Sequence, residues 1–251
     1  MQRIKTTIAG LMMASTLVSG ASQAALIETV DFNNNGVPSG WAFQDVSSGQ
    51  HHTGIANGRF YADQTDSASY LRRGYAPEFG ATSLQITWEG NIFQTLWGNE
   101  QILSLKNTAG ETWSVGAWSK NYHFGSGIRF FTTDETQNHS SLTGYNYQHG
   151  NFQSGVYSLT AIFSDGLISY SGVLNGVTIF DFDTQVANFR LADQRTIQLY
   201  IAETEGPTQW VDNLSIREVL GSSVPEPSSV MLLGLALTGL AASRRHQSFG
   251  S

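Results

Sequence analysis

The sequence predicts an all-β domain built as a two-sheet antiparallel sandwich. Between residues 25 and 220, no stretch keeps a 3.6-residue apolar period for ten residues, whereas apolar and polar residues often alternate. Gly, Ser, Thr and Asn interrupt the chain at short intervals, as turns do. Two pairs, Asp165-Gly166 and Asn175-Gly176, separate β-patterned runs and suit type I′ hairpin turns.

The first half of this body alternates between short strands and polar loops. Residues 83–89 place Leu84, Ile86 and Trp88 on one face, and 107–110 join the next two strands as a hairpin. Polar, Gly-containing stretches at 33–40, 45–58 and 133–154 predict loops, the last being the longest. We expect strands at 26–32, 41–43, 59–62, 69–72, 83–89, 101–106, 111–118 and 127–132.

The second half contains the best-specified part of the sandwich. Runs at 156–163, 167–174 and 177–182, joined by the two Asx-Gly turns, predict a three-stranded meander. Alternating residues at 195–203 and 209–217 predict two closing strands.

The N-terminus has the pattern of a signal peptide. Arg3 and Lys5 precede a mostly apolar run at 8–18, and Ser22-Gln23-Ala24 offers small residues for cleavage after Ala24. We therefore divide the chain into a signal peptide at 1–24, a sandwich domain at 25–220 and a tail at 221–251. The body holds nearly all the acidic residues and has a formal charge of about −10, which argues against a nucleic-acid partner. The chain has no Cys, so thiol chemistry is excluded.

The tail has three parts that suit a membrane segment. Val224-Pro225-Glu226-Pro227 forms an extended break, because proline does not continue a helix. Residues 230–242 are apolar apart from Thr238, and as a helix they reach roughly 20 Å, short of a ~30 Å hydrocarbon core. Arg244-Arg245 would stay at the cytoplasmic face.

This arrangement resembles the PEP-CTERM sorting tail of exported Gram-negative bacterial proteins. The resemblance implies that the apolar helix enters the membrane before processing and that an exosortase recognises and removes the tail. It also implies delivery to the outer surface or to an exopolysaccharide matrix. The chain departs from the pattern in having only two arginines, followed by residues 246–251.

The body resembles the concanavalin A-like lectin/glucanase jelly roll. Three groups carry this resemblance: Asp31-Phe32 with Gly40-Trp41, the Asn175-Gly176 hairpin, and the closing segment 210–214. The resemblance implies that the first and last strands lie together in one sheet.

Two acidic pairs are candidates for glycoside hydrolysis. Asp181 and Asp183 lie on one face of a strand, about 7 Å apart, a spacing that suits paired carboxylates. Glucanases with this fold carry a further Glu on the same strand, and here Thr184, Gln185 and Val186 follow instead. Glu203 and Glu205 form the second pair, and Gly206-Pro207 follows them in place of a further acidic residue. We therefore assign no catalytic residue and expect no enzyme.

A structural calcium ion is the one cofactor that the sequence suggests. Asp31 and Asp212 each occur at an otherwise apolar strand, where an unpaired charge is costly. If the terminal strands are neighbours, these carboxylates and Asn213 could share calcium, as related jelly rolls do. The alternative is a surface Asp31 and an Asp212 that bonds its own turn. The histidines lack the spacing of a metal site.

Aromatic side chains are candidates for a glycan site, because sugar rings stack on aromatic faces. Trp88, Trp113 and Trp210 alternate with aliphatic residues and are expected in the core. Trp97 and Trp118, at strand ends, and Tyr145 and Tyr147, in the long loop, are the candidates for glycan binding.

The sequence thus predicts an exported surface or matrix protein with a structural or adhesive role. A carbohydrate-binding, lectin-like module and a degenerate glycosidase are the alternatives. An exposed aromatic groove on one sheet would favour the first alternative, and a cleft with two carboxylates would favour the second.

Overall fold

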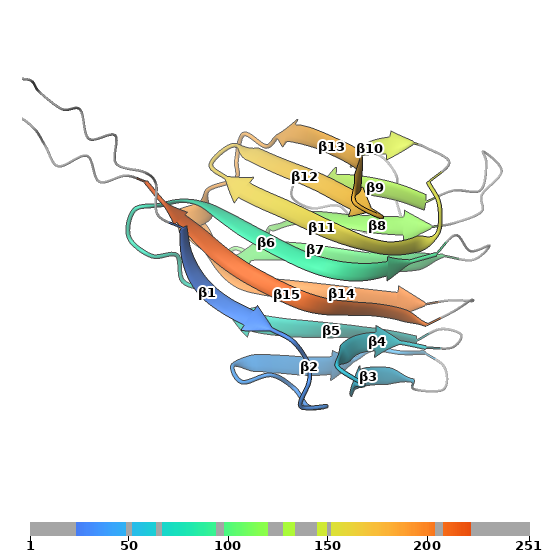
Figure 1. Ribbon diagram of the computed structural model, residues 1–251. Coiled ribbons are helices and arrows are strands. Elements are labelled where there is room, and N and C mark those ends of the chain that lie inside the picture. The colour runs from blue at the N-terminus through green and yellow to red at the C-terminus, as the bar shows by residue number, and fades with distance from the viewer. Residues whose placement is uncertain are drawn as a thin grey trace, which may run out of the picture. The chain divides into compact units, whose positions relative to one another are not determined.

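The computed structural model describes residues 24–48, 52–63, 67–93, 98–119, 128–133, 145–149, 152–203 and 208–221 (Figure 1). They belong to one compact unit, Gln23–Gly221. None of the described residues forms a helix long and apolar enough to cross a membrane. The predicted signal sequence before Ala24 and the predicted apolar helix at 230–242 lie outside the described residues.

The described part of the chain is built from β-strands, with a single 3₁₀ turn, η1 (Leu191–Asp193), and no α-helix. The strands are β1 (Ala24–Val30), β2 (Trp41–Asp45), β3 (Thr53–Ala56), β4 (Arg59–Ala62), β5 (Ser67–Gly74), β6 (Ala81–Ile92), β7 (Asn99–Asn107), β8 (Thr112–Ser119), β9 (Ile128–Thr133), β10 (Tyr145–His149), β11 (Gly155–Ser164), β12 (Leu167–Leu174), β13 (Val177–Gln185), β14 (Gln194–Glu203) and β15 (Gln209–Leu220).

These strands form two antiparallel sheets that face each other (Figure 1). Sheet A has the order β13-β12-β11-β6-β15-β4-β3, and β1 also pairs with β15. Sheet B has the order β10-β9-β8-β7-β14-β5-β2. The predicted two-sheet jelly-roll sandwich is therefore confirmed, and the first and last strands are neighbours as expected.

Every predicted strand is present, but two strands were missed. β3 falls in the predicted loop at 45–58, and β10 falls in the predicted loop at 133–154, so Tyr145 and Tyr147 lie on a strand. A signal for β3 was available in the sequence. Asn57 and Gly58 have φ of 53° and 74°, as a type I′ turn requires, and they join β3 to β4.

The two turns of the meander differ from each other. Asn175 and Gly176 have φ of 52° and 78°, which confirms the type I′ prediction. In the other loop only Gly166 has a positive φ, 75°, so the type I′ prediction was wrong there. The Asp165 carboxylate instead accepts a hydrogen bond from the Leu191 backbone N–H at 2.8 Å, which ties this loop to η1.

Aromatic side chains fill much of the space between the sheets. Phe130 of sheet B stacks on Phe180 of sheet A, with ring centroids 3.9 Å apart. The ring centroids of Tyr157 and Phe130 lie 5.2 Å apart, and those of Tyr170 and Phe180 lie 4.9 Å apart. Such pairs add to the free energy gained from apolar burial. Trp88 and Trp113 are each 1% exposed, in agreement with their predicted core positions.

The last predicted core tryptophan, Trp210, is placed differently. β15 contains a bulge between Asp212 and Ser215, and Asn213 there has a φ of 50°. A bulge adds one residue and so shifts the inward–outward alternation. Val211 is therefore in the central core, whereas Trp210 is buried as predicted, at 8% exposed, but outside the central cluster and on the outer face of sheet A.

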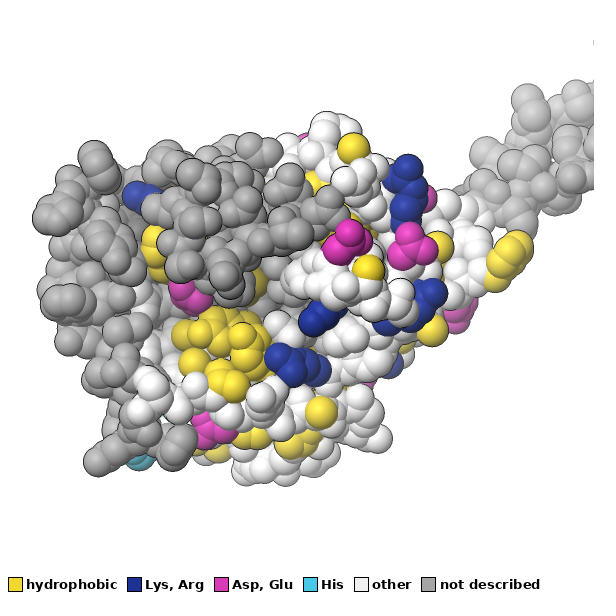
Figure 2. Space-filling view, turned by 180° about the vertical axis from the view of Figure 1, so that it is seen from behind, with side chains coloured by type: hydrophobic (Ala, Val, Ile, Leu, Met, Phe, Trp, Pro, Cys, Tyr) yellow, Lys and Arg dark blue, Asp and Glu magenta, His cyan; other side chains and the backbone are white. Residues whose placement is uncertain are grey.

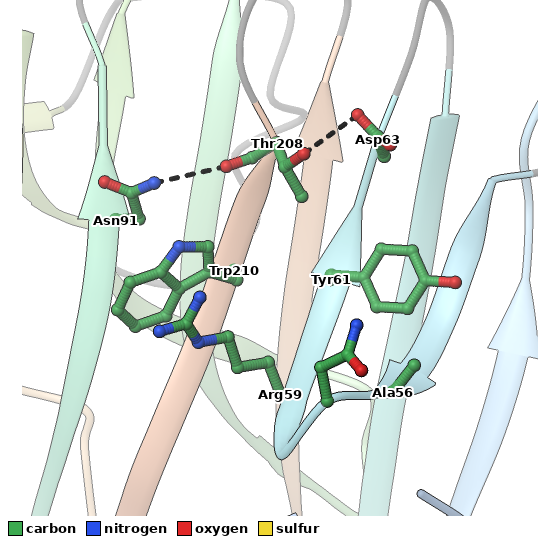
Figure 3. A pocket seen from close by; sticks show the side chains of 8 residues that line it. Ala56, Arg59, Tyr61, Asp63, Asn91, Thr208 and Trp210 are labelled. Atoms are coloured by element: carbon green, nitrogen blue, oxygen red, sulfur yellow. Dashed lines mark hydrogen bonds between the residues drawn. The ribbon is translucent and has the colours of Figure 1, made fainter.

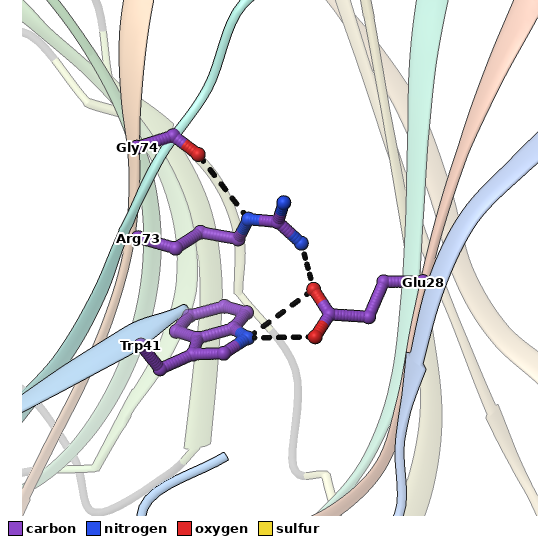
Figure 4. A network of polar contacts seen from close by, with 4 residues as sticks. All are labelled: Glu28, Trp41, Arg73 and Gly74. Atoms are coloured by element: carbon purple, nitrogen blue, oxygen red, sulfur yellow. Dashed lines mark hydrogen bonds and ion pairs between the residues drawn. The ribbon is translucent and has the colours of Figure 1, made fainter. Parts of the chain in front are cut away.

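A polar contact ties the two sheets together near β1 (Figure 4). Trp41 of sheet B donates its indole N–H to both oxygens of Glu28 of sheet A, at 3.1 and 3.2 Å. Arg73 forms an ion pair with the same carboxylate and donates to the Gly74 carbonyl at 3.2 Å. Because the Glu28 and Arg73 side chains are only 21% and 24% exposed, this pair is shielded from water.

A second polar contact between the sheets is fully buried. The Gln101 side-chain amide donates to the carbonyls of Asn91 and Trp210 at 2.7 and 3.2 Å, and to Gln209 Oε1 at 3.0 Å. Gly90 makes room for it, since a Cβ there would lie 2.3 Å from Gln101 Oε1. Glu203, 1% exposed, accepts the Gln209 N–H at 3.3 Å, and its Oε1 has no partner.

Burial of Glu203 predicts a pH-dependent stability. Burial, opposed by the Gln209 N–H and assisted by the Asp63 charge, raises the pKa of Glu203 from 4.5 to about 8. The folded protein therefore holds a proton that the unfolded chain loses, and stability should fall as pH rises from about 4.5 to 8. We expect Glu203→Gln, which keeps the shape of the neutral acid, to match the wild type at pH 4.5 and to exceed it by roughly 1–3 kcal/mol at pH 8.5.

Urea unfolding at both pH values measures this difference. Asp181→Asn, at an exposed carboxylate of sheet A, is the control and should change stability equally at both pH values. A constant difference between Glu203→Gln and the wild type across this range would contradict the prediction.

Candidate functional site

The outer face of sheet B carries a row of large side chains that crosses the sheet. Tyr70 pairs with Tyr200, and Tyr200 pairs with Ile102. Ile102 pairs with Gly116, which pairs with Phe131. Directly paired residues present their side chains on the same face, so these residues form one line across β5, β14, β7, β8 and β9. We call Tyr70, Tyr200, Ile102 and Phe131 the aromatic strip.

Figure 2 shows the molecule from the side of sheet B, where hydrophobic side chains gather beside Lys and Arg side chains. The rings of Tyr70 and Tyr200 lie 4.7 Å apart and are tilted by 37°. Ile102 and Phe131 are buried, whereas both tyrosines are half-buried. The tyrosines therefore form the solvent-facing part of the aromatic strip.

Gly116 determines how close Phe131 lies to the sheet. A Cβ at Gly116 would lie 3.0 Å from the Phe131 ring and 2.4 Å from the Gln101 carbonyl oxygen. Only glycine therefore leaves room for the ring to rest against the backbone of β8.

Hydrogen-bonding side chains run along one side of the aromatic strip. The Arg72 guanidinium lies 4.4 Å from the centre of the Tyr70 ring. It donates to Gln198 Oε1 at 2.6 Å and to Gln44 Oε1 at 2.8 Å. These contacts hold a cation and two amide groups in fixed positions beside the ring.

Charged residues and Trp118 lie on the other side of the aromatic strip. Trp118 pairs with Glu100 on one neighbouring strand and with Arg129 on the other. The Arg129 guanidinium lies 5.6 Å from the Trp118 ring. Burial and the nearby Glu100 carboxylate raise the pKa of Tyr200 well above its usual value, so its phenol keeps its proton and can donate a hydrogen bond.

This arrangement combines ring faces with hydrogen-bonding groups at both edges. The half-buried tyrosines offer apolar contact, and Arg72, Gln198 and Glu100 offer donors and acceptors on either side. An extended ligand with apolar faces and many hydroxyl groups matches such a surface.

The predicted glycan residues are partly placed by the structure. Trp118 lies on this face, half-buried. The backbones of Tyr145 and Tyr147 pair with Thr133 and Phe131 at the edge of sheet B. Their side chains, and the whole of Trp97, are not among the parts of the chain that the structure describes.

Sequence reasoning missed Tyr70, Tyr200 and Arg72. A signal was present, because Tyr70 and Tyr200 occupy outward-facing positions of predicted strands, where smaller polar residues are usual.

The predicted calcium residues lie near one another along β15. Val30 pairs with Leu214, so Asp31 follows next to Asn213, and Asp212 pairs with Glu89. Asp31 accepts the Asn33 N–H at 3.2 Å and Asp212 accepts the Asn213 N–H at 2.7 Å. Among the described residues, no three His, Cys, Asp or Glu side chains are grouped to hold a metal ion. The calcium set is thus incomplete without further oxygen ligands.

Three of the four residues of the predicted acidic pairs are placed by the structure. Asp181 and Asp183 are exposed on β13, at the edge of sheet A. Glu203 is buried between the sheets, and Glu205 lies outside the described residues.

Comparison with known proteins identifies the tail. Residues 223–245 match the family model described as the PEP-CTERM protein-sorting motif. The protein carries a PEP-CTERM sorting motif. This confirms the prediction made from Val224–Pro227 and Arg244-Arg245, and it indicates an exported protein sorted to the cell surface.

The body is similar in fold to lectin-like solved structures. The CBM2 module of the evolved Dit of Lactobacillus casei BL23 phage J-1 is 11% identical with a TM-score of 0.61, over 80% of this chain and 98% of that one. The exoplasmic/lumenal domain of VIP36 in its Ca2+/Man2-bound form is 10% identical with a TM-score of 0.59. The match covers 80% of this chain and 90% of that one.

A lectin from Bauhinia forficata in complex with GalNAc is 11% identical with a TM-score of 0.54. The match covers 80% of this chain and 99% of that one. At these identities the likeness shows the fold alone. No curated protein sequence matches this chain.

The fit of Phe131 against Gly116 gives a prediction. Gly116→Ala should lower the free energy of unfolding by roughly 1–3 kcal/mol, because the new methyl group meets backbone and ring together. Gly74→Ala, also in sheet B, is the matched control, since a Cβ there meets nothing within 4 Å. Chemical denaturation measures both variants, and equal stabilities would contradict the proposed packing.

Proposed function

We propose that this exported protein binds polysaccharide through the aromatic strip and serves as a non-catalytic adhesive component of the cell surface or its exopolysaccharide matrix. One observation carries the proposal: Tyr70 and Tyr200 lie side by side on the outer face of sheet B, with Arg72 held beside them by two amide groups. Ring faces and fixed hydrogen-bonding groups are what a sugar chain requires.

Several further observations support a polysaccharide rather than another class of ligand. The acidic body disfavours nucleic acid. Sorting to the surface brings the protein next to envelope polysaccharide. Proteins of similar fold have been solved with Man2 and with GalNAc bound, which is compatible with sugar binding by this architecture.

The sorting motif adds a processing partner to this proposal. An exosortase would recognise Val224–Pro227 and remove the tail, which would leave the sandwich at the outer surface of a Gram-negative cell. Adhesion then follows from the sandwich alone, since the tail acts only in delivery.

The proposal includes no reaction. Asp181 and Asp183 project from an edge strand, and the buried Glu203 lies between the sheets. Hydrolysis of a glycosidic bond requires two carboxylates on opposite sides of a bound sugar, and our proposal assigns that role to neither pair.

Substitution within the aromatic strip tests the proposal. We expect Tyr70→Ala and Tyr200→Ala each to weaken binding to a polysaccharide by about tenfold, because each removes a ring face worth on the order of 1 kcal/mol or more. Affinity electrophoresis of the full-length chain, in gels that contain the exopolysaccharide of the producing strain or a neutral β-glucan, measures this change.

Phe79→Ala is the matched control, because Phe79 is an exposed aromatic residue between β5 and β6 that belongs to neither candidate surface. Its retardation in the same gels should equal that of the wild type. If all three variants were retarded as strongly as the wild type, with unchanged melting temperatures, binding at the aromatic strip would be refuted.

A structural calcium ion near β15 is a separate proposal. Asp212 and Glu89 are directly paired on sheet A, and like charges placed opposite each other are destabilising unless something neutralises them. Asp31 follows the end of β1 close by, and Asn213 already donates its side-chain N–H to Glu89 at 2.9 Å. Calcium would need backbone or loop oxygens in addition to these carboxylates.

Thermal melting tests this calcium proposal. Millimolar calcium should raise the melting temperature by several degrees relative to chelator-treated protein, because binding to the folded state stabilises it. Asp212→Asn should remove this rise, and Asp181→Asn should not. A melting temperature that is the same with calcium and with chelator would exclude the ion.

A further inference from the structure

A hollow lies on the outer surface of sheet A, on the face of the sandwich opposite the aromatic strip (Figure 3). Its volume is about 490 Å³, and its residues come from the β3–β4 hairpin, β6 and the start of β15. The lining includes Arg59, Tyr61, Asp63, Asn91, Thr208 and Trp210. A volume of this size accommodates a small ligand rather than a single water or ion.

Three side chains on and just after β4 set the chemistry of the hollow. Arg59, Tyr61 and Asp63 occupy alternate positions, so they face the same side of the sheet and extend over roughly 13 Å. The order along the strand is a cation, an aromatic ring and a carboxylate. Tyr61 leans across Gly54 of β3, where a Cβ would lie 3.6 Å from its hydroxyl group.

Arg59 is positioned but not neutralised. Its guanidinium lies 3.8 Å from the centre of the Trp210 ring, as Figure 3 shows. It makes no ion pair or hydrogen bond with any residue in the described part of the chain. The ring fixes the cation in place while its N–H groups remain available, which is the arrangement of an anion-binding arginine.

The other end of the hollow is held by hydrogen bonds. Thr208 donates its hydroxyl hydrogen to Asp63 at 2.9 Å, and Asn91 donates its amide N–H to the Thr208 carbonyl at 3.3 Å. A carboxylate in this position accepts hydrogen bonds from ligand hydroxyl groups and repels a second anion. The anionic group of a ligand is therefore confined to the Arg59 end.

We propose that this hollow binds a disaccharide-length segment of an acidic polysaccharide. The uronate carboxylate pairs with Arg59, a sugar ring packs against Tyr61, and hydroxyl groups of the neighbouring sugar donate to Asp63. An amino acid is too short to reach both charged ends, and a phosphate-rich chain would meet Asp63. This site is separate from the aromatic strip, so a single domain with both sites links two polysaccharide chains.

Binding of galacturonosyl-rhamnose, which joins one uronate to one neutral sugar, tests this site on the full-length chain by isothermal titration calorimetry. Its methyl ester is the matched uncharged probe. We expect a Kd on the order of 0.1–1 mM for the acidic disaccharide and at least tenfold weaker binding of the ester. Arg59→Gln should weaken binding of the acidic disaccharide about tenfold, and Asp63→Asn should weaken it several-fold.

Two controls separate this site from the alternatives. Arg217→Gln removes another exposed cation of sheet A and should leave binding of the acidic disaccharide unchanged, as should Tyr70→Ala in the aromatic strip. Equal binding of the acid and the ester, equal losses in Arg59→Gln and Arg217→Gln, or no binding of the acidic disaccharide would each overturn the proposal. Loss in Tyr70→Ala alone would place the acidic sugar on sheet B instead. The aromatic strip could fail its own test without affecting these results.

Discussion

The last strand, β15, is the element on which the arrangement of sheet A and of its hollow depends. One of its edges pairs along most of its length with β6, while its other edge is shared by β4, opposite 209–211, and β1, opposite 214–219. The bulge at Asp212 and Asn213 lies where one partner ends and the other begins. By shifting the alternation there, the bulge keeps Val211 and Leu214 in the core and leaves Trp210 outside, where it supports Arg59.

The sequence was sufficient to predict the sandwich because alternation and turn residues are local signals. The strands that were missed, β3 and β10, are short and lie in polar surroundings, so their stability comes from pairing with β4 and β9 rather than from their own pattern. The bulge in β15 was also not predictable. In the sequence, Asp212-Asn213 fits a continued alternation of inward and outward residues, and only the pairing with β6 reveals the bulge.

The candidate sites were less predictable than the fold for a related reason. The aromatic strip combines residues from five strands, and only the register brings Tyr70 next to Tyr200 and Phe131 onto Gly116. The sequence-based prediction considered exposed aromatic residues in loops and at strand ends, and so identified Trp118 but not Tyr70 and Tyr200. Trp210 was assigned to the core by its alternation, which hid its contact with Arg59.

The buried polar contacts show why both surfaces can keep fixed shapes without disulfides. Gln101 of sheet B bonds to β6 and β15 of sheet A directly behind the hollow, and Glu28 binds Trp41 and Arg73 across the sheets near β1. Such contacts have directional geometry, so they fix one alignment of the sheets, whereas apolar packing alone tolerates small slips. With the sheets aligned in this way, the aromatic strip and the hollow point in opposite directions. Two weak sites that face apart cannot hold the same short segment together, and their joint effect is to link separate chains.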